Sequence, residues 1–513
     1  MSAVYAGIPS GRYAQIGEVC DRARNALGKL MLPIIIVVGL ETLYLKLTDS
    51  AGAEAFALIG GSTCAAVAVW RTRAVGLPLL PLMAFQALMV YGIPIVAGHE
   101  SLTSYPAQFA FEAGLEVLIF NVAMTVVWWL CMQIMHPSPA VSFALREFNQ
   151  SSSRGMMVLG FGLLGASTLF LVLQGLVLLD ALYELIPNGG VSILTALVSV
   201  LGACGLFLVS MAIGAGDATP LQRASFWVLL VFNTIIAADG FILAAAGANL
   251  VTAGVGLFWG SGRVPWGYLT IALLGLAFLN VGKVTMRERY WGDDDTPAAE
   301  ITLQRLPAVF SEWCDASYQG ILENNSAPTG PTPPGGVRRN KNQTLLDRID
   351  NLQNLLFVID AIKTDHVPTL KGASYAIIPP LLVPRVLWPE KPRSHEGQIM
   401  LNVHFGRQDL ESTLKTYIAW GLLPEAYGNF GAVWGSVGLG ACLGAFFAWI
   451  ENLTARKLVV SMEGFLSLCL LFALMNSFEM VSSVLVTSIF QSMLIVVGSC
   501  AMFVERTVSP KAP

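Results

Sequence analysis

The sequence predicts an all-α polytopic membrane protein, and its composition and apolar patterning carry this prediction. Of the 513 residues, 55% are hydrophobic and only 12% are charged, which is far from the composition of a soluble domain of this length. The mean hydropathy is +0.63. The apolar stretches are long and continuous and do not alternate with polar residues, so they suit spanning helices rather than the strands of a barrel.

Each helical crossing of a bilayer core requires about 20 apolar residues. By this length rule we expect about eleven transmembrane helices, within a range of roughly 10–12. Their expected positions are residues 30–48, 53–70, 75–97, 107–133, 156–179, 188–214, 224–246, 264–284, 430–452, 459–477 and 480–503. The segment Ala248–Gly260 is apolar but short and rich in glycine, and we interpret it as a re-entrant or interfacial piece.

The chain is expected to divide into four regions. They are a cytoplasmic leader at 1–29, an N-terminal transmembrane bundle at 30–284, a large loop at 285–429, and C-terminal transmembrane helices with a short tail at 430–513. The first apolar run follows a polar leader, carries Glu41 and lacks a cleavage pattern, so it is expected to stay as an anchor.

The large loop contains a linker rich in proline and glycine at 326–343 and an amphipathic pattern that begins at Leu345. This pattern predicts a helix that is too polar to span a membrane. Such a helix could lie flat on the membrane surface, cover a cavity between helices, or pack onto other loop elements.

Basic residues in the short loops predict the orientation, because Lys and Arg concentrate on the cytoplasmic side. They are Arg12, Arg22, Arg24, Lys29, Arg71, Arg73, Arg146, Arg154, Arg223, Arg456, Lys457, Arg506 and Lys511. Both termini are therefore expected in the cytoplasm, and Glu425 and Asn429 outside it. Because Lys283, Arg287 and Arg289 also favour the cytoplasm, one more crossing is needed, either at 248–262 or within 300–388. We expect 300–429 to be largely extracytoplasmic, because long loops escape the charge rule.

A cationic motif, Val383–His395, stands out against the apolar background. Its basic side chains are Arg385, Lys391, Arg393 and His395. Prolines forbid a regular helix here and stiffen the backbone that carries these cations. Arginine presents a bidentate fork to phosphate oxygens, so a diphosphate is the candidate ligand. The alternative is an interfacial loop whose cations face lipid headgroups and whose Trp388 lies in the aromatic belt.

A second motif, Glu425–Gly431, leads directly into the helix expected at 430–452. Glu425 is the candidate general base, since a carboxylate at the mouth of an apolar bundle beside Tyr427 would have a raised pKa and could accept a proton from a sugar hydroxyl. Alternatively, Glu425 is an acid favoured by the dipole at a helix N-terminus. The following glycines allow close helix contact; they are Gly431, Gly435, Gly438, Gly440 and Gly444.

These two motifs resemble those of the oligosaccharide repeat-unit polymerases, the Wzy-type O-antigen and exopolysaccharide polymerases. The matching residues are Pro-Arg-x-Leu-Trp-Pro-Glu-Lys-Pro at Pro384–Pro392 and Glu-x-Tyr-x-Asn-Phe-Gly-x-x-x-Gly at Glu425–Gly435. A Gly-Ser-x-Arg turn before a helix, Gly260–Arg263, and a large extracytoplasmic loop among many helices also fit. Motif identity is otherwise confined to these segments, and the rest of the chain matches in hydropathy alone.

The resemblance implies a glycosyltransferase of the GT-C type that uses neither metal nor cofactor. It would polymerise undecaprenyl-diphosphate-linked repeat units on the periplasmic side of the bacterial inner membrane. Lipid-linked glycans and the bilayer are the implied partners, a chain-length-determining co-polymerase is allowed, and nucleic acid is not expected. Arg385, Lys391 and Arg263 are then expected to bind the diphosphates, with Arg385 stabilising the leaving group. Glu425 or His395 would be the base, and Arg393, Tyr427 and Asn429 would supply further sugar or phosphate contacts.

Other functions remain open from the sequence. An O-antigen ligase would share the donor chemistry and the charged loop. A transporter or flippase is favoured by acids within expected helices, namely Glu112, Glu116 and Asp239. It is disfavoured by the lack of repeated halves.

Two further features of the sequence carry little chemistry. Asp293–Asp295 imitates the metal-binding motif of nucleotide-sugar transferases but lies in a polar loop with no predicted strand around it. The cysteines show neither a disulfide framework nor metal-ligand spacing.

Overall fold

The protein divides into two compact units in the computed structural model. Unit 1 comprises Met1–Gln150 with Ile349–Pro513, and unit 2 is Ser151–Arg348. The structure describes residues 16–48, 50, 52–136, 142–145, 153–176, 178–179, 188–238, 240–241, 243–291, 302–326, 349–383, 387–388, 390–415, 418–455, 457, 462–475, 477–501 and 504–507.

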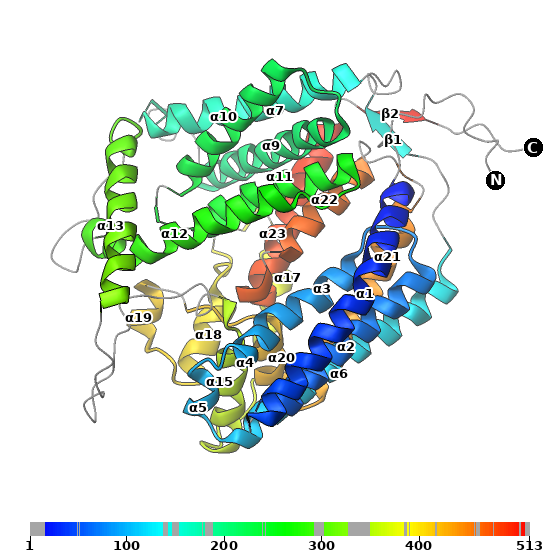
Figure 1. The fold of residues 1–513 in the computed structure, drawn as a ribbon, viewed down its shortest axis with the longest axis vertical. Helices are drawn as coiled ribbons and strands as arrows, with labels where there is room; N and C mark the ends of the chain where they lie inside the picture. The colour runs from blue at the N-terminus through cyan, green and yellow to red at the C-terminus, as the bar shows by residue number, and fades with distance from the viewer. Residues whose placement is uncertain are drawn as a thin grey trace, which may run out of the picture. The chain divides into compact units, whose positions relative to one another are not determined.

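Unit 1 is built almost entirely from helices (Figure 1). Its N-terminal elements are α1 (Ile16–Leu47), α2 (Ala53–Arg73), α3 (Leu79–Ala87), η1 (Leu88–Gly92), α4 (Ile93–Val96), α5 (Ser101–Ser104) and α6 (Ala107–Ile134). After unit 2 follow α15 (Leu352–Lys363), α16 (Ala373–Ala376), α17 (Ile378–Leu381), α18 (Glu396–His404), α19 (Leu410–Lys415) and α20 (Leu422–Phe430). The chain ends with α21 (Trp434–Thr454), α22 (Met462–Met475), η3 (Ser477–Glu479) and α23 (Ser482–Ala501). Two short strands, β1 (Ser142–Leu145) and β2 (Val504–Thr507), pair antiparallel.

Unit 2 consists of long helices in its described part. They are α7 (Ser153–Gly175), α9 (Asn188–Ala215), α10 (Pro220–Ala237), α11 (Leu243–Ser261), α12 (Trp266–Tyr290) and α13 (Leu306–Ser326). One buried core joins α7, α9, α10 and α11 around Leu164, Val209 and Phe226. A second joins α12 to α13, where the indole of Trp313 donates to the carbonyl of Leu279 at 2.8 Å.

The expectation of a polytopic helical membrane protein is confirmed. Within the described residues, nine helices are long and apolar enough to cross a membrane. Those of unit 1 are Cys20–Leu47, Ala53–Arg73, Leu79–Val96, Ala107–Ile134 and Trp434–Thr454. Those of unit 2 are Met157–Gly175, Leu197–Ala215, Pro220–Ala237 and Trp266–Tyr290. Of the last two helices expected to cross, α22 has 14 residues, and α23 has an apolar stretch at Ser482–Leu494 within the described residues.

The expected boundary between a helix at 224–246 and a separate segment Ala248–Gly260 is wrong, whereas the re-entrant or interfacial placement of that segment stays a prediction. These residues belong to α11, a continuous helix of 19 residues. The chain turns earlier than expected, at the end of α10, where Phe241 has a φ of 56°. The dipeptide Asp239-Gly240, which is typical of turns, directly precedes Phe241, but the apolar residues on both sides of it favoured one helix over 224–246.

The predicted amphipathic helix is α15, and it is more deeply buried than its polar pattern suggested. Leu352, Leu355 and Ile359 are fully covered, and Asn354 from the expected polar face is only 7% exposed. The helix packs on α6 and α20. Asn351, which precedes it, lines a cavity of about 30 Å³ together with Tyr91. The helix α15 therefore covers part of the bundle at α6 and also packs onto α20, which belongs to the expected large loop.

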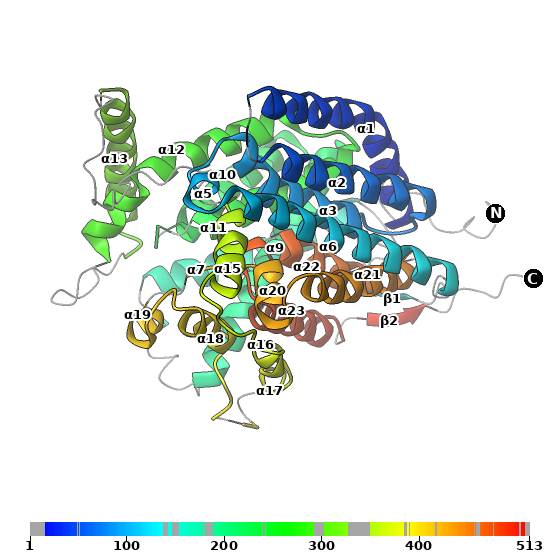
Figure 2. The same cartoon turned by 90° about the horizontal axis from the view of Figure 1, so that it is seen from below.

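Unit 1 has two distinct ends. At one of them α1 begins and α21 finishes, because the backbone N–H of Ile16 donates to the carbonyl of Lys457 at 3.0 Å. At the other end, here called the motif end, α6, α20, α21 and α23 begin. Views from two directions show α5, α15, α18 and α20 gathered there, away from the start of α1 (Figures 1 and 2).

Close packing of α6 against α21 organises unit 1. A Cβ at Gly440 would lie 2.5 Å from the carbonyl oxygen of Phe120, and one at Gly444 would overlap the carbonyl oxygen of Met124. Small residues at a spacing of four allow two helix backbones to approach closely. Gly438, two residues before Gly440, faces open space.

We predict that Gly444→Val separates α6 from α21 and destabilises the folded protein. Overpacking of a tight contact costs about 1–3 kcal/mol, and here backbone atoms must move. The melting temperature of the purified protein in detergent should fall clearly. Gly438→Val is the matched control and should leave it nearly unchanged; equal melting temperatures for the two variants would contradict the packing described.

Candidate functional site

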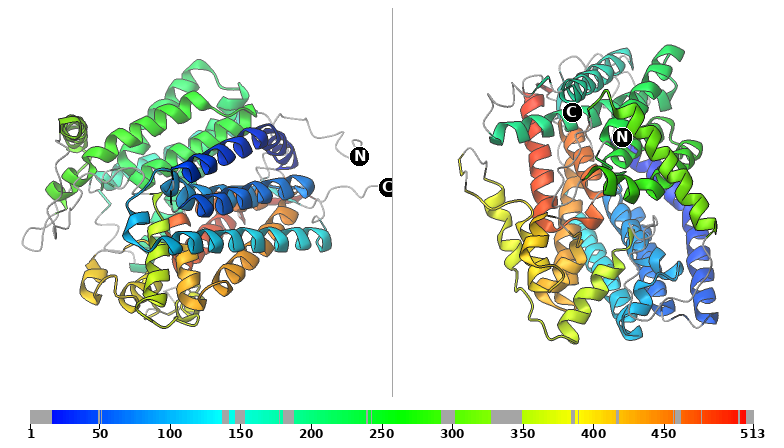
Figure 3. Two further views of the ribbon diagram at one scale, coloured as in Figure 1. Left: turned by 60° about the horizontal axis from the view of Figure 1, so that its bottom comes forward. Right: turned by 90° about the vertical axis from the view of Figure 1, so that its left-hand side faces the viewer.

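The two sequence motifs converge on the first turn of α23. The backbone N–H of Ser482 donates to Oε2 of Glu425 at 2.6 Å. The hydroxyl of the next residue, Ser483, donates to the carbonyl oxygen of Ser394 in the cationic motif at 3.1 Å. Figure 3 shows the segment with α16–α18, in yellow, beside the red α23. One helix start therefore holds both motifs together.

Gly397, in the first turn of α18, makes this convergence tight. A Cβ there would lie 3.0 Å from the hydroxyl oxygen of Ser483 and 3.7 Å from the carbonyl oxygen of Ser374. The hydroxyl of Ser374 itself donates a hydrogen bond to the Glu425 carboxylate. Only one layer of side chains therefore separates the end of the cationic motif from Glu425.

Glu425 is the centre of a buried hydrogen-bond network. Its Oε1 accepts from the hydroxyl of Ser374 at 2.7 Å, and that hydroxyl oxygen accepts from Nδ2 of Asn429 at 2.9 Å. Oδ1 of Asn429 accepts from the backbone N–H of Gly372 at 3.1 Å. Glu425, Ser374 and Asn429 are each 0% exposed. The network joins α16, α20 and α23.

Backbone hydrogen bonds extend this network to the end of α20. The N–H of Leu370 donates to the carbonyl of Gly428, and the N–H of Lys371 donates to the carbonyl of Asn429. These bonds satisfy carbonyls that a helix end leaves without partners. Lys371 and Gly372 adopt positive φ angles of 50° and 89° to make the turn.

The position of Glu425 differs from the expected bundle mouth beside Tyr427. The Tyr427 hydroxyl instead donates to Oε1 of Glu112 at 2.9 Å. Residues two apart on a helix point to opposite sides, whereas Glu425 and Asn429, four apart, share a face. Glu425 has no contact with solvent in this arrangement, so the contacts seen give it a positioning role, and its role as a base stays a prediction.

Burial raises the pKa of Glu425, while the hydrogen bonds from Ser482 and Ser374 act in the opposite direction. Burial also raises the pKa of the neighbouring Tyr375, and the charge of Glu425 adds to this. The folded protein therefore favours the protonated form of the Glu425 carboxyl more than an unfolded chain does.

The cationic motif is partly folded on itself. Nζ of Lys391 donates to the carbonyls of Leu381 at 2.7 Å and Val383 at 2.5 Å, close to the end of α17. His395 is the residue before α18, half-buried, with Nδ1 3.3 Å from Oε1 of Gln398. Arg393 is exposed, and Trp388 is 42% exposed. Arg385 lies outside the described residues.

Arg263 belongs to unit 2 and is exposed in the turn between α11 and α12. Its backbone N–H donates to the hydroxyl of Ser261 at 3.1 Å, which shapes the expected Gly-Ser-x-Arg turn. Its part in diphosphate binding stays a prediction.

The acids that favoured a transporter have structural partners. Glu116 accepts the backbone N–H of Val433 at 2.9 Å and the hydroxyl of Ser436, and so caps the start of α21. Glu112 accepts from Nζ of Lys363 at 2.6 Å as well as from Tyr427. Asp239 and Asp293–Asp295 lie outside the described residues. In the part of the chain that is described, no three His, Cys, Asp or Glu side chains group to hold a metal ion.

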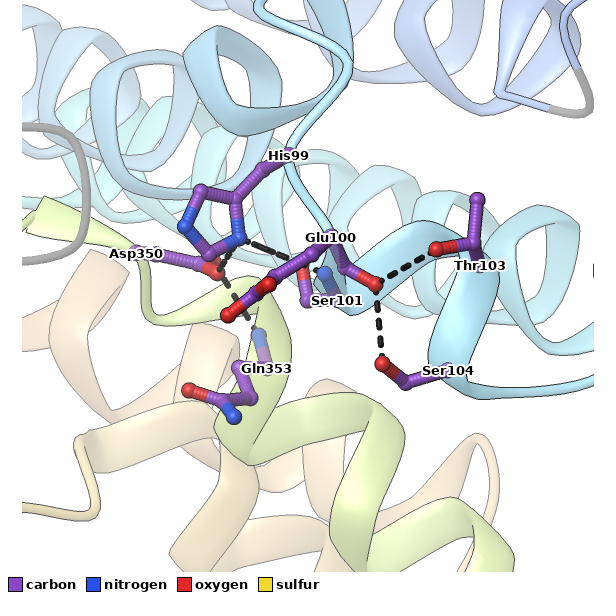
Figure 4. A network of polar contacts seen from close by, with 7 residues as sticks. All are labelled: His99, Glu100, Ser101, Thr103, Ser104, Asp350 and Gln353. Atoms are coloured by element: carbon purple, nitrogen blue, oxygen red, sulfur yellow. Dashed lines mark hydrogen bonds and ion pairs between the residues drawn. The ribbon is translucent and has the colours of Figure 1, made fainter. Parts of the chain in front are cut away.

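A polar cluster lies where α15 begins, and it was not predicted from the sequence. His99 Nδ1 lies 2.9 Å from Oδ2 of Asp350 and 3.1 Å from the hydroxyl of Ser101 (Figure 4). Oδ1 of Asp350 also accepts the backbone N–H of Gln353 at 3.1 Å. Ser101 and Asp350 approach the same imidazole nitrogen, so the three residues do not form a relay for nucleophilic catalysis. The cluster instead ties α15 to the segment before α6.

Two other charged residues were also missed, the buried Glu451 and the half-buried Arg407. Glu451, near the end of α21, accepts the indole N–H groups of Trp70 and Trp128, both at 3.0 Å. The rule that flags acids within spanning helices would have found it. Arg407 donates from Nη1 to Oδ1 of Asn354 at 2.6 Å and lies beside two aromatic rings. No local pattern marked it, because its partners come from distant segments.

Comparison of the chain with models of known families, with curated proteins and with solved structures finds no match.

We predict that Glu425→Gln changes how stability depends on pH. Because the folded pKa is raised, the carboxyl stabilises the protein fully below the unfolded pKa of about 4.3, and this contribution is lost as pH rises through the folded pKa. The melting temperature of the wild type should therefore fall from acidic to neutral pH. Glu425→Gln should weaken that fall, while Glu54→Gln, exposed at the start of α2, should not; identical pH profiles in all three would contradict the assignment.

Proposed function

We propose that this protein polymerises undecaprenyl-diphosphate-linked oligosaccharide repeat units into a surface or secreted polysaccharide. One observation supports this most: Ser482 and Ser483 hold the Glu425–Gly431 motif and the cationic motif against one another. Both motifs carry the resemblance to repeat-unit polymerases, and they are separate segments of the sequence. A common site for them is what a shared reaction requires.

The reaction that suits these residues is direct glycosyl transfer. A hydroxyl oxygen of the acceptor glycan bonds to the anomeric carbon of the donor, while the bond from that carbon to the diphosphate oxygen breaks. The proton of the hydroxyl passes to a base, and the lipid diphosphate leaves with the electron pair. Cations at the leaving group stabilise the charge that develops on it. Arg385 and Arg393 would serve there.

His395 is the better placed of the two candidate bases. It is half-buried at the edge of the cationic motif, whereas Glu425 is fully covered. A general base must reach the proton that it removes. Glu425 would then position the cationic motif through α23, and Lys391 would shape its backbone by binding the carbonyls near the end of α17.

The distribution of charge supports a periplasmic site. Arg22 and Arg24 lie near the start of α1, and Arg71 and Arg73 lie in the last turn of α2, so these cations share the end of unit 1 away from the motifs. Basic residues favour the cytoplasm. The motif end would then face the periplasm of a bacterial inner membrane.

We predict that Arg385→Ala abolishes polymer while protein level and single-repeat lipid stay normal, because the diphosphate loses its main cation. The measurement is a gel profile of lipid-linked glycans from cells with the wild type, the variant or a deletion. Lys46→Ala removes an exposed cation from the last turn of α1, at the motif end but outside both motifs, and should keep the full ladder.

The same gels separate the other functions. Single repeats without a ladder in the deletion and in Arg385→Ala are the expected result. Normal polymer that stays on its lipid carrier in the deletion strain would indicate a ligase. Repeats trapped on the cytoplasmic side would indicate a transporter, and a normal ladder in Arg385→Ala would overturn the role of that residue.

A further inference from the structure

Arg407 is held rigidly at the motif end of unit 1. Its guanidinium carbon lies 5.3 Å from the ring centre of Phe357 and 5.9 Å from that of Trp420. Nη1 donates to Oδ1 of Asn354 at 2.6 Å. Two aromatic rings and one hydrogen bond fix the plane of the guanidinium, so little freedom is lost when it binds a ligand.

The charge of Arg407 is not matched by a neighbouring acid. Its hydrogen-bond acceptor, Asn354, is neutral, and none of the carboxylates that the structure describes forms an ion pair with it. The nearby acids have other partners or stand further off: Asp350 pairs with His99, and Asp360 acts on Tyr105. Burial lowers the pKa of Arg407, so the guanidinium is partly withdrawn from water. Such a cation is normally paired in proteins.

The hydroxyl of Tyr105 lies close enough to act electrostatically on Arg407. A guanidinium with several unused N–H donors next to a hydroxyl is suited to the oxygens of a phosphate group. The site is thus a rigid receptor for an anion with more than one oxygen.

Helix α18 separates Arg407 from the cationic motif. Helix α18 has nine residues, with Arg393 before it and Arg407 after it. A helix of this length extends about 13 Å. The two phosphorus atoms of a diphosphate are joined through a single oxygen, so one diphosphate cannot occupy both ends of α18.

We propose that Arg407 forms a second diphosphate site, so that unit 1 binds two lipid diphosphates, one at each end of α18. This inference rests on the proposed function, because a repeat-unit polymerase must hold a lipid-linked donor and a lipid-linked acceptor together. The cationic motif would bind the leaving diphosphate, and Arg407 the diphosphate of the acceptor. A ligase, whose acceptor differs, has no need of the second site.

The test counts bound diphosphates on the full-length protein in phosphatidylcholine nanodiscs, with radiolabelled farnesyl diphosphate as the probe. The wild type should bind two per chain. Arg407→Gln and Arg385→Gln should each bind one, and the double variant none. Arg407→Lys keeps the charge but not the fork, and should bind the second probe about tenfold more weakly. If Arg407→Gln does not fold, Arg407→Lys alone decides, and unchanged affinity there would overturn the proposal.

Two bound probes on Arg407→Gln, or one on the wild type, would also overturn it. Nanodiscs with phosphatidylglycerol separate lipid diphosphate from ordinary headgroups: the second probe should stay bound, and its displacement would make this a headgroup site. The binding count reports on the site alone, whereas the glycan ladder of the deletion strain reports on polymerisation. The two measurements therefore distinguish failure of the proposed Arg407 site from failure of the proposed polymerase function.

Discussion

The arrangement of the motif end depends on one interaction, the hydrogen bond from the Ser482 backbone to the buried carboxylate of Glu425. The N–H groups at a helix start lack partners within the helix, and a carboxylate that accepts one also interacts favourably with the helix dipole. If the carboxylate were lost, the N–H would be buried without a partner, at a cost of about 1–3 kcal/mol. Ser483 would then lose its position against Ser394, and the cationic motif its main anchor.

A second glutamate in unit 1 also accepts a backbone N–H group at a helix start. Glu116 of α6 accepts the backbone N–H of Val433, just before α21, much as Glu425 of α20 accepts that of Ser482. Val433 has a φ of 67°, which is costly for a β-branched residue, and the bond to Glu116 helps to hold it there. Two buried acids thus fix the starts of α21 and α23, and with them the loop that leads from Asn429 into the bundle. Acids within a membrane protein need not carry protons or cargo when they cap helices in this way.

Helix positions were predictable wherever long apolar runs were bounded by charge, as at 107–133, which became Ala107–Ile134. The turn at Phe241 was not predicted, although Asp239-Gly240 precedes it, because the apolar residues on both sides favoured one helix over 224–246. The two motifs were recognisable in the sequence, but their contact with the same turn of α23 was not predictable. Ser482 and Ser483 are separated from their partners by 57 and 89 residues, and no local pattern encodes such contacts. For the same reason the burial of Glu425 and the aromatic setting of Arg407 required the tertiary structure.

We propose that unit 1 presents one site in which two lipid-linked glycans react. The most direct measurement uses the purified protein in liposomes, supplied with lipid-linked single repeats extracted from the deletion strain. We expect a ladder of longer lipid-linked glycans, with one lipid diphosphate released for each new linkage. Repeats that cross the bilayer without joining, or that remain unchanged, would contradict it.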